Sequence, residues 1–186
     1  MPWRNGGGIT TEIAIAHGAA ESLDPAVAEH DPRFLYRVSI ADVASDGPFS
    51  RFGGYDRHIM LLEGAGMTLD CGAHGRIDLT RRLDPRTFSG DWDVVGALVA
   101  GPVRDFNLMV DRATASSSLE VRTVDRAETI ACARGDTCVI HVLEGALDGA
   151  FEGETLIAEA DVELAPRAQN ARVAIARVNL RASRTP

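Results

Sequence analysis

Lysine is absent from this chain, and all 19 of its basic residues are arginine. The absence excludes a Schiff-base lysine, a pyridoxal-phosphate anchor and the lysine of a phosphate-binding loop, because each of these needs a side-chain amine. The chain is acidic overall, with a net charge of −8. Binding to nucleic acid requires clustered cations, so we expect no nucleic-acid partner.

Cysteine is scarce, and long apolar runs are missing. The three cysteines, Cys71, Cys132 and Cys138, lack CxxC spacing, which argues against a disulfide framework and a zinc knuckle and favours small buried side chains. No stretch approaches the length of a membrane span, and the first residues lack the pattern of a signal peptide. The sequence therefore predicts a cytoplasmic protein without a membrane partner.

Short alternating segments make up much of what is present. In Ile9–Ile15 and in Phe34–Ile40, side chains alternate with a period of two, which is typical of β-strands. Glycine and proline interrupt the chain often and no long amphipathic helix is visible, so we predict an all-β sandwich or barrel. Further strands are expected at Val94–Val99, Phe106–Val110, Leu119–Val124, Cys138–Leu143, Thr155–Ala158 and Ala171–Val178.

One segment of the first half recurs in the second half. HIMLLEGAG (His58–Gly66) is echoed by VIHVLEGAL (Val139–Leu147), with the Leu-Glu-Gly triplets superposed. Each copy is interpreted as a buried strand that ends in a glycine turn, which makes Glu-Gly a turn device. In the first copy we expect Met67–Asp70 to return as the second arm of a hairpin. RDFNLMV (104–110) also resembles ARVNLRA (176–182).

The repeat predicts two fused β-barrels of the jelly-roll type. The only low-complexity segment, ATASSS, occupies residues 113–118 and is the natural seam between the halves. We therefore expect a first lobe at residues 1–112 and a second lobe at residues 119–186.

Four blocks of the sequence resemble the HutD/Ves family: MPWRNGGGITTEIAI, YRVSIADVASDGPFSRFGGYDRHIMLLEGAGMTL, FSGD and GPVRDFNLMV. The resemblance implies a two-lobed cupin, that is, a double-stranded β-helix (RmlC-like jelly-roll) bicupin. It implies association with bacterial histidine-utilisation genes, or with cold or stress response for Ves-type relatives. Family members usually carry residues before the Met-Pro-Trp block, so we expect either a late start codon or an edge strand missing before Met1.

Cupins that use a metal hold it with a His-x-His pair, a following Glu and a later His. The five histidines here include no pair at that spacing, and Met60 stands where a partner of His58 would lie. A thioether is a poor ligand for a hard divalent ion. We therefore expect no metal and no cofactor, and we interpret His58 and His141 as strand residues that are packed or hydrogen-bonded beside the core.

Polar side chains lie on one face of several otherwise apolar strands: Thr10 with Glu12, Arg37 with Ser39, and Asp105 with Asn107. If that face lines a small barrel, it makes a ligand pocket; if it is the outer face, it is simply solvated. Both interpretations remain open at this stage.

Arginine could hold a carboxylate in such a pocket, because its planar fork binds carboxylates bidentately. Arg37 and Arg57 are the candidates, although Arg57, next to Asp56, could also serve only to fix a glycine turn. Trp3 and Phe49 could form the walls. The predicted ligand-binding residues are Trp3, Asn5, Thr10, Glu12, Arg37, Ser39, Phe49, Arg57, Asp105 and Asn107.

These residues predict a metal-free cupin that binds a small carboxylate-bearing metabolite. By the resemblance it would regulate or sense histidine utilisation, with a ligand related to histidine, urocanate or formylglutamate. One alternative is a metal-independent isomerase or hydrolase, for which Glu12, Glu63, Asp56 and Asp105 could include a general acid, although no catalytic set is recognisable. The other is a Ves-like interaction module without a small ligand. A homodimer is kept open as a further partner.

Overall fold

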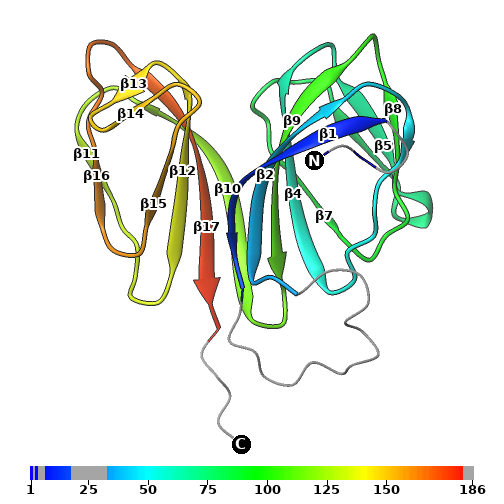
Figure 1. Cartoon of the computed structure of the whole chain (residues 1–186), viewed down its shortest axis with the longest axis horizontal. Helices are drawn as coiled ribbons and strands as arrows, with labels where there is room; N and C mark the ends of the chain where they lie inside the picture. Colours follow the sequence, from blue (N-terminus) through cyan, green and yellow to red (C-terminus); the bar gives the residue numbers. More distant parts are fainter. Residues whose placement is uncertain (2, 4–6, 18–32, 182–186) are drawn as a thin grey trace, which may run out of the picture. The chain divides into compact units, whose positions relative to one another are not determined.

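The computed structural model describes residues 1, 3, 7–17 and 33–181. Within these residues the only helix is a three-residue 3-10 turn at Gly72–His74, and nearly every other regular element is a β-strand (Figure 1). None of the described residues forms a helix of the length and apolar character that crossing a membrane demands. The all-β prediction is confirmed. The segment His17–Arg33, whose glycine, prolines and charged residues predict a loop, lies almost entirely outside the described residues.

The chain divides into two compact units. The first comprises residues 1–82 and 86–114, and the second comprises residues 83–85 and 115–186. The boundary between residues 114 and 115 falls inside the ATASSS segment, of which residues 115–118 already belong to a strand.

Two sheets face each other in the first unit. The larger is antiparallel and contains, in spatial order, β1 (Gly8–Ala16), β2 (Tyr36–Val43), β9 (Val103–Asp111), β4 (Tyr55–Glu63) and β7 (Arg86–Ser89). The smaller contains β3 (Gly47–Pro48), β8 (Val95–Leu98), β5 (Met67–Asp70) and β6 (Arg76–Leu79). Apolar side chains from both sheets, such as Ile59, Leu61, Met67 and Leu69, fill the space between them. One face of the larger sheet therefore points into the interior of a barrel.

The chain passes from one sheet to the other at Gly64–Gly66. The strand β5 pairs with β6 and β8, not with β4, so the predicted hairpin between these strands is wrong. Gly64 has a φ of 98°, and a Cβ there would lie 2.6 Å from the carbonyl oxygen of Pro102. Glycine is required at this turn because it redirects the chain in a crowded place.

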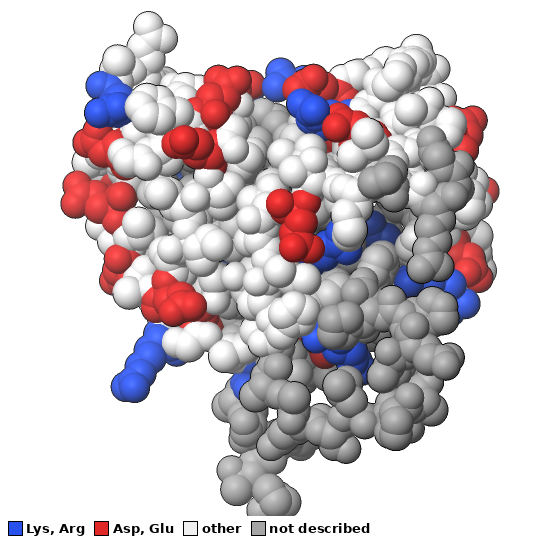
Figure 2. Space-filling model, viewed as in Figure 1, with Lys and Arg blue, Asp and Glu red and all other residues white. Residues whose placement is uncertain are grey.

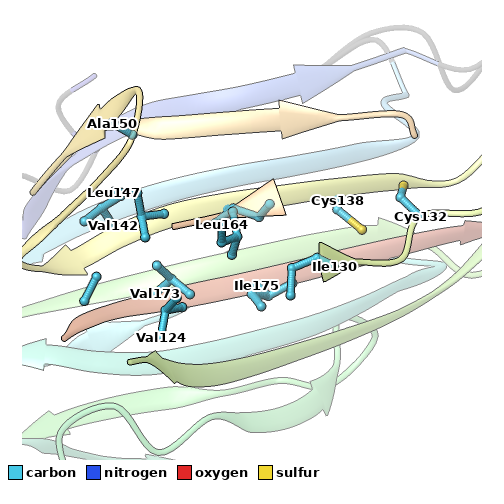
Figure 3. Close-up of a cluster of buried hydrophobic side chains, with 12 residues drawn as sticks. Val124, Ile130, Cys132, Cys138, Val142, Leu147, Ala150, Leu164, Val173 and Ile175 are labelled. Atoms are coloured by element: carbon cyan, nitrogen blue, oxygen red, sulfur yellow. The ribbon is translucent and has the colours of Figure 1, made fainter. Parts of the chain in front are cut away.

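The second unit has a four-stranded sheet opposite two short strand pairs. The sheet contains β10 (Ala115–Val124), β17 (Ala171–Leu180), β12 (Thr137–Glu144) and β15 (Thr155–Ala158). The pairs are β11 (Glu128–Ile130) with β16 (Val162–Leu164), and β13 (Ala146–Leu147) with β14 (Ala150–Phe151). Figure 3 shows Val142, Val173 and Ile175 from the sheet packing with Ile130 and Leu164 in an apolar interior.

The Leu-Glu-Gly repeat marks the same feature in both units. In β4 the register shifts between Leu61 and Glu63, and in β12 it shifts between Val142 and Glu144, so each triplet begins at a β-bulge. After the bulge Glu63 ion-pairs with Arg104 at 3.6 Å. Its counterpart Glu144 ion-pairs with Arg172 at 3.3 Å. The predicted repeat is confirmed.

The second sequence echo is out of register. Because Arg104 and Arg172 occupy equivalent positions opposite the two bulges, RDFNLMV (104–110) corresponds to residues 172–178 and not to 176–182. The apparent match reflects a shared Asn-Leu dipeptide. Strand register is determined by which residues face the core.

Candidate functional site

The polar residues of four neighbouring strands meet on the inner face of the five-stranded sheet. Ser39 of β2 lies opposite Glu12 of β1 on one side and opposite Asn107 of β9 on the other. Arg57 of β4 and Arg37 of β2 both lie opposite Met109 of β9. Because a strand repeats every two residues, these side chains share a face with the apolar core.

Arg57 is the centre of this arrangement. The residue is only 5% exposed, and its guanidinium carbon lies 4.8 Å from the ring centre of Phe88 and 5.5 Å from those of Phe49 and Phe52. Its Nη2 donates to Asn107 Oδ1 at 3.1 Å, and its Nη1 donates to a backbone carbonyl oxygen at 3.3 Å. Nε has no hydrogen-bond partner among the described residues. Three aromatic rings thus hold the guanidinium while part of its donor edge stays unused.

Asp105 forms the other end of a short polar chain. The residue is 1% exposed, and its Oδ1 accepts a hydrogen bond from Asn107 Nδ2. Its Oδ2 is buried without a hydrogen-bond partner among the residues that the structure describes. Asn107 therefore links a buried cation to a buried carboxyl group, and each of the two charged groups keeps one unsatisfied polar atom.

Burial shifts the titration of both groups. Loss of solvation raises the pKa of Asp105 to about 7, against the opposing effects of the Arg57 charge and the Asn107 hydrogen bond. Loss of solvation also lowers the pKa of Arg57 to about 10, which the charge of Asp105 opposes and that of Arg37 reinforces. Near neutral pH, Arg57 is therefore positively charged, whereas Asp105 is close to its pKa and is only partly ionised.

A second arginine lies nearer to solvent. Arg37 Nε is 3.3 Å from Glu12 Oε2, within ion-pair distance but without hydrogen-bond alignment. The Arg37 side chain is 11% exposed and that of Glu12 is 40% exposed. The polar face therefore extends from the buried Arg57 to a pair that water can reach.

Trp3 and Thr10 join the same region. Trp3 Nε1 donates to Thr10 Oγ1 at 2.7 Å, and the Trp3 ring meets the Phe49 ring edge-on at a centroid distance of 6.5 Å. Asn5 lies outside the described residues. Of the other nine predicted site residues, seven lie on the inner face of the sheet. The remaining two, Trp3 and Phe49, contact side chains of that face.

Sequence reasoning missed Phe52, Phe88 and the backbone carbonyl of Ser50, which complete the surroundings of Arg57. Two signals were available. Phe88 opens the FSGD block and lies opposite Arg57 in the pairing of β7 with β4. Phe52 follows Phe49 at a spacing of three, in the turn before β4.

The two strand histidines are buried and hydrogen-bonded, as predicted. His58 Nδ1 lies 3.0 Å from Thr87 Oγ1, and His141 Nδ1 lies 2.8 Å from Thr155 Oγ1. Burial lowers the pKa of both imidazoles. No three His, Cys, Asp or Glu side chains in the described ranges are grouped so that they could hold a metal ion.

A separate surface hollow of about 210 Å³ lies beside Glu63, Gly64 and Arg104. None of the ten predicted site residues lines it. Figure 2 shows acidic side chains scattered over the face in view, with basic side chains in small groups beside several of them. The hollow lies beside the structural ion pair at the first bulge, whereas the polar set around Arg57 is internal.

These features define a β-barrel protein of the cupin type with a charged interior in its first unit. A cupin 2 conserved barrel domain protein from Leptotrichia buccalis superposes with a TM-score of 0.54 over 94% of this chain and 89% of the other, at 11% identity, which supports the fold alone.

The chain belongs to the HutD family, whose model matches residues 1–181. HutD from Pseudomonas fluorescens SBW25 superposes with a TM-score of 0.75 at 29% identity, covering 98% of this chain and 94% of that chain.

Two relatives known from sequence are also similar. An uncharacterized 21.2 kDa protein in the hutC 3′ region of Pseudomonas putida is 42% identical over 109 residues, 59% of this chain and 52% of that protein. Protein Ves from Citrobacter koseri is 37% identical over 145 residues, 77% of this chain and 68% of that protein. The matched region thus spans about half of the P. putida protein.

Proposed function

We propose that this protein binds a small carboxylate-bearing metabolite inside its first barrel and acts as a regulator or sensor of histidine utilisation. The observation that carries the proposal is the state of Arg57. It is a buried cation enclosed by three aromatic rings, its Nε is unpartnered, and no carboxylate of the described residues lies within ion-pair distance of it.

Such a residue is costly to keep. A buried charge normally requires a paired counter-charge, because the solvation that it loses is worth several kcal/mol. Here the fold supplies one amide and one carbonyl oxygen, each accepting a single hydrogen bond from the guanidinium. Five N–H groups are available on a guanidinium, so a bidentate edge is left for an anion. The rings fix the plane in which a carboxylate would be recognised.

The relatives supply the biological setting. The P. putida relative is described by its position in the hutC 3′ region, and the P. fluorescens neighbour is named HutD. Histidine, urocanate and N-formylglutamate all carry the carboxylate that Arg57 would bind. These compounds are therefore the first panel to test.

A thermal-shift titration with the panel tests the proposal. We expect saturable stabilisation that follows RT ln(1 + [L]/Kd), and about 2.7 kcal/mol at a ligand concentration of 100 Kd. Arg57→Lys retains charge but loses the fork, so the ligand shift should disappear. Arg76→Gln, an exposed arginine in the same unit, is the matched control and should respond like the wild type.

The result that contradicts the proposal is specific. If no panel compound at millimolar concentration stabilises the wild type, or if the folded Arg57→Lys variant responds fully, Arg57 is a structural cation only. Circular dichroism of each variant separates loss of binding from loss of the fold.

A metal-independent enzyme is the second candidate, and the titration of Asp105 favours it. A carboxyl group with a pKa of about 7 is suited to exchange a proton at neutral pH. Incubation with urocanate or N-formylglutamate, followed by mass spectrometry, would reveal turnover that Asp105→Asn removes.

A further inference from the structure

Asp105 is buried with few polar contacts for a carboxyl group. Its paired neighbours on the inner face are Ala41 of β2 and Leu61 of β4, and both are buried apolar residues. Its single hydrogen bond comes from Asn107, while Oδ2 has no partner in the described part of the chain. An unsatisfied, fully buried carboxyl oxygen beside an arginine site needs an explanation.

We propose that Asp105 is a second ligand-binding group, which takes up one proton as the ligand's carboxylate enters beside Arg57 and then donates a hydrogen bond from Oδ2 to that carboxylate. This inference rests on the proposed function, and it adds a proton to the binding reaction. The balance is simple: an ionised Asp105, one proton from solvent and one ligand carboxylate give a neutral Asp105 hydrogen-bonded to the ligand.

The charges around Asp105 support this step. Arg57 of β4 and Asp42 of β2 interact electrostatically with Asp105. Arg37 of β2 interacts with Arg57, and Glu12 of β1 is ion-paired with Arg37. The facing sheet contributes the apolar Met67 and Leu69. On the inner face, Arg57 and Arg37 balance Asp105 and Glu12, so an entering carboxylate would leave one negative charge uncompensated. Protonation of Asp105 restores neutrality and turns a repelling oxygen into a donor.

The proton is available at physiological pH. Asp105 has a pKa of about 7 before any ligand enters, and a second carboxylate nearby raises it further, because two adjacent carboxyl groups cannot both ionise in a dry site. The observed affinity should therefore be constant below about pH 7 and should fall about tenfold per pH unit above it.

Isothermal titration calorimetry with N-formylglutamate, and with acetate as a minimal carboxylate, tests the inference. At pH 8, titrations in phosphate and in Tris, whose heats of ionisation differ, should reveal uptake of about one proton per ligand. At pH 6 the uptake should fall towards zero. The carboxyl groups of both probes stay ionised between these pH values, so the proton is taken up by the protein.

Two variants sharpen the test. Asp105→Asn mimics the neutral acid, and it should bind with a Kd that does not change with pH and without proton uptake. Asp78→Asn changes an exposed carboxyl group that is ion-paired with Arg76, and it should retain the pH dependence of the wild type.

The outcomes are distinguishable. Binding at pH 8 without proton uptake, or loss of all binding in a folded Asp105→Asn variant, overturns the role of Asp105 and leaves the proposed function standing. If acetate and all three panel compounds fail to bind at both pH values, the proposed function is overturned, and this inference with it.

Discussion

The interiors of the two units differ more than their scaffolds do. Superposing the two bulges makes Arg57 equivalent to Cys138, and the facing arginines make Asp105 equivalent to Val173 and Asn107 to Ile175. The first unit thus contains a cation, a carboxyl group and an amide, where the second contains a thiol and two aliphatic side chains. Two barrels with the same turn devices thus differ inside: the first combines an apolar core with a buried polar set, whereas the interior of the second is apolar (Figure 3).

The comparison indicates a division of roles. An apolar interior stabilises a fold through burial and close packing. Buried polar groups reduce that stability, and proteins tolerate such a loss mainly at functional sites. Under the proposed function, the first unit would recognise the ligand and the second would support the fold.

Introducing a carboxyl group into the apolar interior of the second unit should strongly destabilise that unit. Val173 is fully buried, and Val173→Asp places a carboxyl group where no Arg57 or Asn107 equivalent exists. We expect a loss of about 5 kcal/mol, because the group is buried without a partner. Val173→Ala, which creates only a cavity, should cost about half as much. Urea denaturation followed by circular dichroism measures both, and equal losses would show that polarity is tolerated there.

The pH dependence of stability should distinguish the first unit. The folded pKa of Asp105, about 7, lies above its ordinary value of 3.8, so folding favours the neutral acid. The free energy of unfolding that the neutral Asp105 contributes is fully present below about pH 4, decreases as the pH rises to about 7 and is constant above that. Between these two limits the free energy of unfolding falls by at most about 4 kcal/mol.

Asp105→Asn isolates this contribution. The variant should be about as stable as the wild type at pH 4 and clearly more stable at pH 8. Denaturant midpoints at several pH values give the comparison. A difference that does not change with pH would show that Asp105 titrates normally in the folded protein.

The two bulge glycines should show a smaller difference between the units. A Cβ at Gly64 would lie 2.6 Å from the carbonyl oxygen of Pro102, whereas one at Gly145 would lie 3.0 Å from that of Asn170. Both residues have a positive φ. We expect Gly64→Ala to cost about 3 kcal/mol and Gly145→Ala about 1 to 2 kcal/mol. The reverse order in thermal unfolding would contradict the crowding seen at the first turn.

Local patterns were sufficient to predict much of the scaffold. Alternation identified most of the longer strands, because one side of each such strand faces a core. It also placed Asp105 and Asn107 on one face, which the register of β9 bears out. The short strand β6 was missed, since its exposed residues Arg76 and Asp78 look like those of a loop.

The remainder depends on contacts between distant segments. The sequence predicts that Arg57 belongs to a site, but not that Phe88, from another strand, covers its guanidinium. It predicts a turn at Gly64–Gly66, but not that the chain leaves one sheet for another there. Pairing partners and burial are set by the whole fold, so no short window of sequence contains them.

Both tryptophans, Trp3 and Trp92, belong to the first unit, and Trp3 contacts the Phe49 ring that lies against Arg57. Intrinsic fluorescence excited at the indole band is therefore a natural optical label for one barrel alone. Their fluorescence would report ligand binding to that barrel and its unfolding without any added dye, while the second barrel, which has no tryptophan, would contribute no indole signal.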